Sequence, residues 1–377
     1  MPSLPRVRNA SLDSQSTVQV NSQSKIFHRV NEGLQAMVSG TPQPVSPERI
    51  LQLMWGHAAP IIIHAGIHNN IFEELASGPL TIDQLHAKTG ASFRGLKALL
   101  NALVGLGLLA KDTEGHYLLT SESTTFLVRK SPHYYGELFC HICEQVIPNW
   151  LGLAEIVRSG KPALHVDQAE DGAAFFERFV EALFPLNYGA ANALAESLCL
   201  AQLNAPYSVL DIAAGSGVWS ICIAMKSPQV RATVIDLPAV LNVTRRMLSR
   251  FGLTDRFRLV AGDMHTADFG KDYQVAILGH ILHSEGEIRS RELLAKTYQA
   301  LAPGGTIAIA EFLVNEERTG PPHSLIFAVN MLVHTEQGDT YSFNEIRRWL
   351  EEAGFEHVRP LEVPAPSPLI LATKPSA

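Results

Sequence analysis

The stretch that decides the fold is Val209-Leu210-Asp211-Ile212-Ala213-Ala214-Gly215-Ser216-Gly217, an apolar strand that ends in a glycine-containing turn. A second apolar run, Ala232-Thr233-Val234-Ile235-Asp236, ends in an acid, and a third segment ends in Ala261-Gly262-Asp263-Met264. Glycine lets the backbone turn tightly and come close to a ligand. The three segments therefore predict strand ends that together form one ligand pocket.

Strands and helices alternate through the C-terminal half of the chain. We expect strands at 208–212, 232–236, 257–261, 274–278 and 305–311, helices near 217–226, 238–252 and 286–301, and two further strands within 355–373. This alternation is typical of a parallel sheet with helices on both faces. Ligands of such sheets bind at the carboxyl ends of the strands, which is where the three motifs lie.

The motifs favour an adenosine-bearing cofactor. Asp236 lies 25 residues after Asp211, at the end of the next strand, where a carboxylate can accept both ribose hydroxyls. Asp263 could accept from an adenine amino group, and Met264 could pack on the ring. The dinucleotide fingerprint and the phosphate-binding loop are both absent, because neither the third glycine nor a Gly-Lys-Ser/Thr sequence follows. Singly, each residue could also be an ordinary turn or helix cap.

Composition narrows the class of protein. The 377 residues are 46% hydrophobic and 18% charged, with a net charge of −7 that argues against a nucleic-acid-binding surface. Four cysteines do not make a disulfide framework, and the first 25 residues lack the apolar core of a signal peptide. The apolar run 58–67 is too short to span a bilayer. We expect a cytoplasmic protein without a membrane or nucleic-acid partner.

Four segments follow from the local patterns. Residues 1–45 form a flexible arm with a helix at 24–38 that could pack on a partner, and residues 46–130 form a winged helix of three helices and a hairpin. Thr81 and Gln84 predict a capping box in this domain. Residues 131–200 form a helical connector, and residues 201–377 form the domain of alternating strands and helices.

With these motifs in view, the chain resembles the class I S-adenosylmethionine-dependent methyltransferases. More narrowly, it is similar to the small-molecule O-methyltransferases that join a winged-helix dimerisation domain to a Rossmann-like catalytic domain. The resemblance covers about residues 46–375 and includes Leu301-Ala302-Pro303-Gly304-Gly305 and Trp349-Leu350-Glu351-Glu352-Ala353-Gly354-Phe355. It implies an α/β fold, S-adenosylmethionine as cofactor and a homodimer formed through the N-terminal domain. The family's three consecutive glycines are here Ala213, Ala214 and Gly215.

The resemblance also assigns a general base, which removes a proton from a hydroxyl acceptor. The family's Lys-x-x-x-His-Asp-Trp motif matches Gly279-His280-Ile281-Leu282-His283-Ser284-Glu285, so His283 takes the position of the base. Glu311 matches the carboxylate that orients this histidine. The family's Lys, Asp and Trp are missing, and a second family Glu has no clean match, Asp339 and Thr340 being closest. His283 could instead be a helix cap, and His280 is expected to point elsewhere.

Motif matching supplies the remaining site residues. Those expected to bind the cofactor are Asp211, Gly215, Gly217, Asp236, Leu237, Asp263, Met264 and Gly279; those expected to bind the acceptor are Phe176, Phe184, Tyr188, Asn330, Met331 and His334. The aromatic residues could equally be helix core. A polar residue in an apolar run, such as Asn330, needs a partner that a substrate could provide. Cys140-His141-Ile142-Cys143 lacks a second pair, so we expect buried thiols and no metal.

The predicted function is transfer of a methyl group to a hydroxyl of a small aromatic or polyketide-like molecule. The altered motif around His283 leaves C-, N- or S-methylation open, as well as a fold member that binds the cofactor without transferring methyl. A winged-helix regulator is a third class. It is disfavoured because the expected third helix of that domain offers only Arg94 and Lys97 to DNA.

Overall fold

The computed structural model describes residues 45–163 and 179–376. The chain divides into two compact units, 1–56 and 57–377, which we describe separately. The predicted helix at 24–38 and the candidate residue Phe176 lie outside the described residues. In the first unit, α2 (Glu48–Met54) begins after Pro47, and the Ser46 hydroxyl accepts a hydrogen bond from the Glu48 N–H at 3.3 Å. Its apolar side chains Ile50 and Leu53 are exposed.

The second unit begins with a small domain of helices and one hairpin. Its elements are α3 (Ala58–His68), α4 (Ile71–Leu75), α5 (Ile82–Thr89), α6 (Phe93–Gly105), β1 (Leu109–Lys111), β2 (Tyr117–Leu119) and α7 (Ser121–Phe126). The predicted capping box is present, because Thr81 and Gln84 exchange side-chain and backbone hydrogen bonds. Leu85, Leu96 and Leu100 help to form a hydrophobic core within this domain.

By length and composition alone, the stretch Glu48–His68 could cross a membrane. This is weak evidence, since core helices of other proteins meet the same criteria. The stretch is also interrupted, because α2 ends at Met54 and α3 begins only at Ala58.

A run of short helices connects this domain to the sheet. It comprises α8 (Gly136–His141), the π-helical turn η1 (Ile142–Val146), α9 (Ile147–Trp150), α10 (Leu153–Ser159), α12 (Leu183–Ser197) and the 3-10 turn η2 (Leu200–Gln202). Pro148 has no N–H to continue the α-helical pattern, and the wider π turn directly precedes it. A π turn is often found at a functional site.

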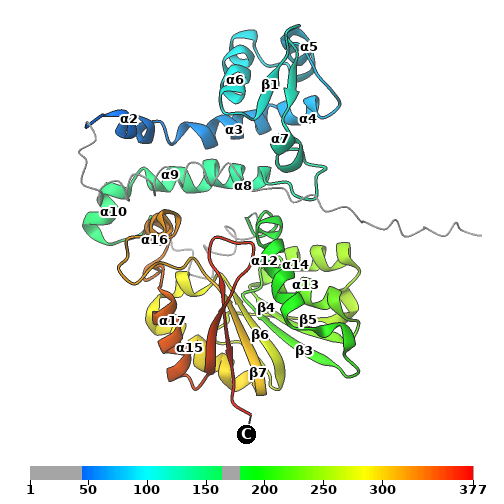
Figure 1. Ribbon diagram of the computed structural model, residues 1–377, viewed down its shortest axis with the longest axis vertical. Coiled ribbons are helices and arrows are strands. Elements are labelled where there is room, and N and C mark those ends of the chain that lie inside the picture. Colours follow the sequence, from blue (N-terminus) through cyan, green and yellow to red (C-terminus); the bar gives the residue numbers. More distant parts are fainter. Residues whose placement is uncertain (1–44, 164–178, 377) are drawn as a thin grey trace, which may run out of the picture. The chain divides into compact units, whose positions relative to one another are not determined.

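The remaining chain forms a seven-stranded sheet of order β5-β4-β3-β6-β7-β9-β8 (Figure 1). The strands are β3 (Tyr207–Ile212), β4 (Val230–Asp236), β5 (Phe257–Ala261), β6 (Tyr273–Gly279), β7 (Leu301–Ala310), β8 (Glu356–Leu361) and β9 (Leu369–Thr373). The first five pair in parallel, whereas β9 runs antiparallel to β7 and β8. The predicted α/β class with a mostly parallel sheet is confirmed.

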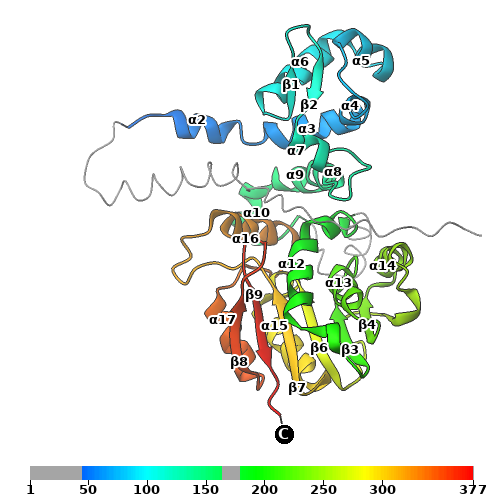
Figure 2. The same cartoon turned by 45° about the vertical axis from the view of Figure 1, so that its right-hand side comes forward.

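Helices cover both faces of the sheet (Figure 2). They are α12, α13 (Val218–Lys226), α14 (Pro238–Phe251), α15 (Leu282–Ala300) and α17 (Phe343–Glu352), with the 3-10 turn η3 (Thr254–Arg256) before β5. Helix α16 (Pro322–His334) packs instead against α9, α10 and α15. Successive side chains of a strand point to opposite faces. Accordingly, Val209 of β3 joins the core that includes residues of α12 and α13, and Leu210 joins the core that includes residues of α15 and α17. Because β3 pairs with both β4 and β6, the strand order reverses there, and a ligand crevice is expected at its carboxyl end.

Candidate active site

One cavity of about 490 Å³ lies at this switch point. Its walls come from the ends of β3, β4, β5 and β6, from the first turn of α15, and from α8, α9, α12 and α16. The charged side chains among its described lining residues are Asp236, Asp263, Glu285 and Arg289. The lining elsewhere is mostly apolar, aromatic or histidine. A cavity of this size, with polar groups gathered at one end, is typical of a cofactor and substrate site.

Asp236 organises the turn after β3. Its carboxylate accepts hydrogen bonds from the Gly215 N–H at 2.7 Å and from the Leu237 N–H at 2.7 Å. Burial raises the pKa of Asp236 to about 6, although both backbone hydrogen bonds act to lower it. Gly215 has a φ of 58°, a left-handed conformation that favours glycine. Gly215, Asp236 and Leu237 all line the cavity, as a cofactor-binding role requires.

Two predicted cofactor residues lie beneath the cavity instead of on its wall. Asp211 is fully buried and its Oδ2 accepts hydrogen bonds from the Ser220 N–H and hydroxyl. Burial raises the pKa of Asp211 to about 7. Gly217 begins α13 with a φ of 75°, and a Cβ there would lie 3.1 Å from Thr244 Cγ2. The structure therefore gives both residues a role in holding the turn, because strand and helix packing covers them.

The end of β5 forms a second wall of the same end of the cavity. Asp263 and Met264 both line it. Asp263 Oδ1 accepts from the His265 N–H at 2.7 Å, and Lys296 Nζ donates to the Met264 carbonyl at 2.8 Å. These bonds fix the backbone of the turn, so that an acid and a thioether stand side by side on the wall.

His283 lines the cavity and forms a buried pair with Glu311. His283 Nδ1 lies 2.7 Å from Glu311 Oε2, and the other carboxylate oxygen accepts from the Leu282 N–H at 2.7 Å. Burial alone would raise the pKa of Glu311, but the His283 ring and its hydrogen bonds outweigh burial and lower the pKa below its ordinary value. A charged Glu311 accepts a hydrogen bond from the Nδ1–H group, which leaves Nε2 of His283 as the nitrogen that can take a proton.

The turn that carries His283 is separated from the rest of α15. Gly286 has φ 73° and ψ 168°, which breaks the helical conformation after the first turn. A Cβ on Gly286 would lie 2.7 Å from the Cβ of Gln337, so a side chain does not fit. The His283 carbonyl accepts from the Asp339 N–H at 2.9 Å. The first turn is thus held by the 337–339 loop as well as by Glu311.

The residues that depart from the family motif have local partners. Glu285 Oε2 lies 2.6 Å from His265 Nε2 and 2.7 Å from Arg289 Nε. The Ser284 hydroxyl donates to the Ile281 carbonyl at 2.9 Å. A Cβ on Gly279 would lie 2.3 Å from Trp219 Nε1, so the indole packs where any larger residue would stand. The residues that replace the family's Lys, Asp and Trp are therefore held by hydrogen bonds and by packing within this protein.

His280 also lines the cavity, contrary to our expectation that it points elsewhere. Its ring centroid lies 4.8 Å from that of Phe312 and 6.3 Å from that of His283. The reason is a φ of 61°, a left-handed conformation that neither strand nor helix periodicity predicts.

The far end of the cavity lies against α9 and α16. Asn330 lines it, and Asn330 Oδ1 accepts from Trp150 Nε1 at 3.0 Å. His334 also lines it, with Nδ1 2.9 Å from the Asn330 carbonyl and Nε2 3.2 Å from Asn149 Nδ2. Met331 completes the predicted group on this wall. Burial lowers the pKa of His334, which keeps the ring neutral near pH 7.

Phe184 and Tyr188 take positions that differ from our prediction. Both pack against the core between α12 and the sheet, and neither lines the cavity. The Phe184 ring stacks on Phe251 of α14, with centroids 5.3 Å apart. The neighbouring residues Leu183 and Asn187 line the cavity instead, because they lie on the other side of α12. Sequence reasoning also missed the lining residues His141, Trp150, Trp219, Phe312 and His323.

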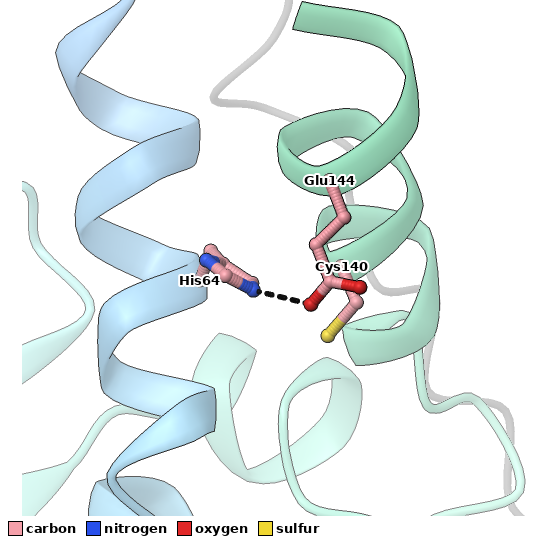
Figure 3. A group of neighbouring side chains, drawn as sticks. All are labelled: His64, Cys140 and Glu144. Carbon is pink, nitrogen blue, oxygen red and sulfur yellow. Dashed lines mark hydrogen bonds and ion pairs between the residues drawn. The ribbon is translucent and has the colours of Figure 1, made fainter. Parts of the chain in front are cut away.

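Away from the cavity, Cys140 lies in a small polar cluster with His64 and Glu144 (Figure 3). His64 Nε2 and Glu144 Oε1 are 3.1 Å apart, and the cluster joins α3 to α8 and η1. Burial, followed by the neighbouring carboxylates Glu137 and Glu144, raises the pKa of Cys140 to about 11. Metals bind the thiolate, so a neutral thiol fits the role of a packing residue.

Comparison with known proteins agrees with this architecture. A family model described as the O-methyltransferase domain matches residues 153–356, and one described as the O-methyltransferase dimerisation domain matches residues 51–129. The 3-hydroxy-5-methyl-1-naphthoate 3-O-methyltransferase of Streptomyces sahachiroi is 30% identical over 87% of this chain and 95% of its own length. The tetracenomycin polyketide synthesis 8-O-methyl transferase TcmO of Streptomyces glaucescens is 30% identical over 87% of this chain and 97% of its own.

Solved structures share the whole fold. A protein of Nostoc punctiforme PCC 73102 superposes with a TM-score of 0.80 at 28% identity, covering 88% of this chain and 100% of its own. Structures of the same fold hold S-adenosylmethionine or its product. The donor end of the cavity fits this group, because its carboxylates suit a ribose, an amine and a positively charged sulfonium. The chain belongs to the O-methyltransferase family and is an S-adenosylmethionine-dependent methyltransferase.

Proposed function

We propose that the protein methylates a phenolic hydroxyl of an uncharged aromatic or polyketide-like molecule, with His283 as the general base. The observation that carries this proposal is the His283–Glu311 pair, 2.7 Å apart, because His283 lines the same cavity as Asp236 and Asn330. The pair offers the acceptor a basic nitrogen whose opposite side is fixed by a carboxylate.

The chain's own residues would act in the following way. Asp236 and Asp263 hold the ribose and the adenine, and Met264 packs on the ring. The bound cofactor supplies an activated methyl group. His283 Nε2 takes the hydroxyl proton, and Glu311 stabilises the resulting imidazolium through Nδ1. Holding the acceptor oxygen close to the methyl group supplies much of the remaining rate acceleration, since proximity accounts for a large part of the acceleration of such transfers.

The lining of the far end supports an uncharged aromatic acceptor. Trp150, Phe312, Phe327 and Met331 supply flat or adaptable apolar surface there. Burial lowers the pKa of His141 to about 4, so its ring, like that of His334, is neutral. Asn330 Oδ1 is taken by Trp150, so the Asn330 amide group remains as a donor for an acceptor oxygen. The two Streptomyces relatives are named as a hydroxynaphthoate 3-O-methyltransferase and a tetracenomycin polyketide synthesis 8-O-methyl transferase, which supports an aromatic or polyketide-like acceptor.

A panel of phenols, catechols and hydroxyquinones with labelled S-adenosylmethionine tests the activity. We expect an O-methyl product, identified by the ¹³C NMR chemical shift of the transferred methyl group. His283→Ala should abolish turnover while the protein still binds S-adenosylhomocysteine, and His357→Ala on the exposed strand β8 is the control. Near wild-type turnover by His283→Ala would refute the base assignment. A methyl group found on carbon, nitrogen or sulfur would instead favour the alternative acceptor atoms.

We further propose that the protein is a cytoplasmic homodimer formed through residues 46–130, with no nucleic-acid or membrane partner. The match to a dimerisation domain supports the dimer, and the exposed apolar residues of α2 give a partner surface to bind. Light scattering on the purified protein should give twice the mass of the chain, and a monomer at micromolar concentration would contradict the proposal.

A further inference from the structure

His280 is held in a conformation that the chain must stabilise at a cost. It is the first residue after β6, and its φ of 61° lies in the left-handed region that non-glycine residues seldom occupy. Its N–H donates to the Ala310 carbonyl at 2.9 Å, which extends the pairing of β6 with β7 and fixes the residue. Strain of this kind clusters at functional sites, where the surrounding structure enforces it.

Among the residues that the structure describes, none forms a hydrogen bond with the side chain of His280. Its ring packs against Phe312 and lies with its centroid 6.4 Å from that of Trp219. Nδ1 is buried, and within residues 45–163 and 179–376 it has no hydrogen-bond partner. A ring nitrogen of His280, one of His283 and an oxygen of Glu311 lie within 4.8 Å of one another, and of the two rings it is that of His283 that hydrogen-bonds to Glu311.

Neutral imidazole always has one N–H donor and one acceptor nitrogen. Burial lowers the pKa of His280 to about 4, so the ring is neutral at physiological pH. Because protein covers Nδ1, Nε2 is the nitrogen through which this cavity-lining ring can meet a ligand. The least costly tautomer leaves the lone pair on the buried Nδ1 and places the proton on Nε2. Within residues 45–163 and 179–376 no hydrogen bond is made to this ring, so a ligand in the cavity is the partner that the proton on Nε2 can reach.

We propose that His280 Nε2 donates a hydrogen bond to a second oxygen of the acceptor, next to the hydroxyl that His283 deprotonates. This inference rests on the proposed function and makes the acceptor a vicinal dihydroxy aromatic compound. The centroids of the two imidazoles are 6.3 Å apart, a span that two adjacent oxygens can bridge with one hydrogen bond to each ring. A single acceptor oxygen would instead have to form hydrogen bonds with both imidazole rings while also facing the methyl donor.

Two probes of the same skeleton test the inference. 2,3-Dihydroxynaphthalene carries two equivalent vicinal hydroxyls, and 2-naphthol carries one. Their affinities for the protein saturated with S-adenosylhomocysteine are measured by calorimetry, so the readout does not depend on turnover. We expect the diol to bind about tenfold more tightly, because loss of one hydrogen bond leaves the His280 donor unpaired.

Three variants identify His280 as the source of that preference. His280→Asn keeps a residue that tolerates the left-handed conformation but shortens the donor, so the ratio of the two affinities should fall to about one. His280→Gln places an amide near the position of Nε2 and should restore part of the ratio. His357 has a φ of 55° and is exposed outside the cavity, so His357→Asn controls for the same substitution in the same backbone conformation.

The outcomes separate this inference from the proposed function. Equal wild-type affinities, no binding of either probe, or a ratio unchanged in His280→Asn would each overturn the role of His280. A preference for the diol that depends on His280 supports it even if neither probe is methylated. In that case, the absence of O-methyl product from the whole acceptor panel would count against the proposed function alone.

Discussion

Replacing Glu311 by Gln tests the central pair most directly. The substitution keeps the size of the side chain and removes its charge. The carboxylate and an imidazolium on His283, centred about 4 Å apart, attract each other by about 4 kcal/mol at an effective dielectric constant of about 20. A neutral amide that still accepts from Nδ1 recovers about 1 kcal/mol of this. The remaining loss of about 3 kcal/mol corresponds to a fall in kcat of about 100-fold.

The assay is steady-state release of S-adenosylhomocysteine at saturating cofactor, measured across pH. Since Glu311 stabilises the protonated ring, the kcat of Glu311→Gln should be lower than that of wild type at each pH. Cofactor affinity should stay within about twofold of wild type. Asp112→Asn is the matched control, because Asp112 pairs with His116 at 3.0 Å in the winged-helix domain far along the chain from the site. A kcat for Glu311→Gln within threefold of wild type would show that the carboxylate does not support proton transfer.

Two further predictions concern the buried acids of the turn after β3. The pKa of Asp236 is raised to about 6, and the ionised carboxylate is the better acceptor for ribose hydroxyls, so cofactor affinity should fall about tenfold per pH unit below 6. Asp236→Ala should remove this dependence on pH. Equilibrium dialysis at pH 5 to 8 measures the affinity, and a wild-type affinity that does not change with pH would contradict the prediction. The pKa of Asp211 is raised to about 7, so the folded state binds the proton more tightly and ionisation costs stability progressively between about pH 4 and 7. Asp211→Asn should therefore be more stable than wild type above pH 7, by roughly 2 kcal/mol once the cost of its unpaired amide N–H is subtracted, and no more stable than wild type near pH 4. Urea unfolding at both pH values measures this difference. A gain in stability at pH 4 as large as that above pH 7 would refute the explanation.

Much of the fold was predictable because the parallel strands are buried on both faces. Runs such as Val209–Ile212 and Ala232–Asp236 are apolar and short, and each is followed by a helix. The donor end of the cavity was predictable for the same reason, since strand ends bring Gly215, Asp236 and Asp263 to one edge. Asp211 shows the limit of this reasoning, because only the packed structure reveals that its side chain lies under the turn.

The acceptor end was harder to predict because it depends on how helices are rotated and packed. The side of α12 that faces the cavity carries Leu183 and Asn187, whereas the more conspicuous Phe184 and Tyr188 face the core. The α8–α9 run contributes His141 and Trp150 from a segment whose path depends on a π turn. His280 was misplaced because periodicity assumes regular backbone angles, and a φ of 61° redirects the side chain.

The break at Gly286 has a consequence for how this enzyme tolerates changes in length. Each residue inserted into a continuous helix rotates everything beyond it by about 100°. Because α15 is interrupted after its first turn, an insertion or deletion within 287–300 would change the rotation of that segment without rotating His283. The turn with the base keeps its own anchors in Glu311 and the Asp339 N–H. A change of length in 287–300 would therefore cost stability through the buried side chains of Leu293 and Leu294, while Glu311 and the Asp339 N–H still hold the turn that carries the base.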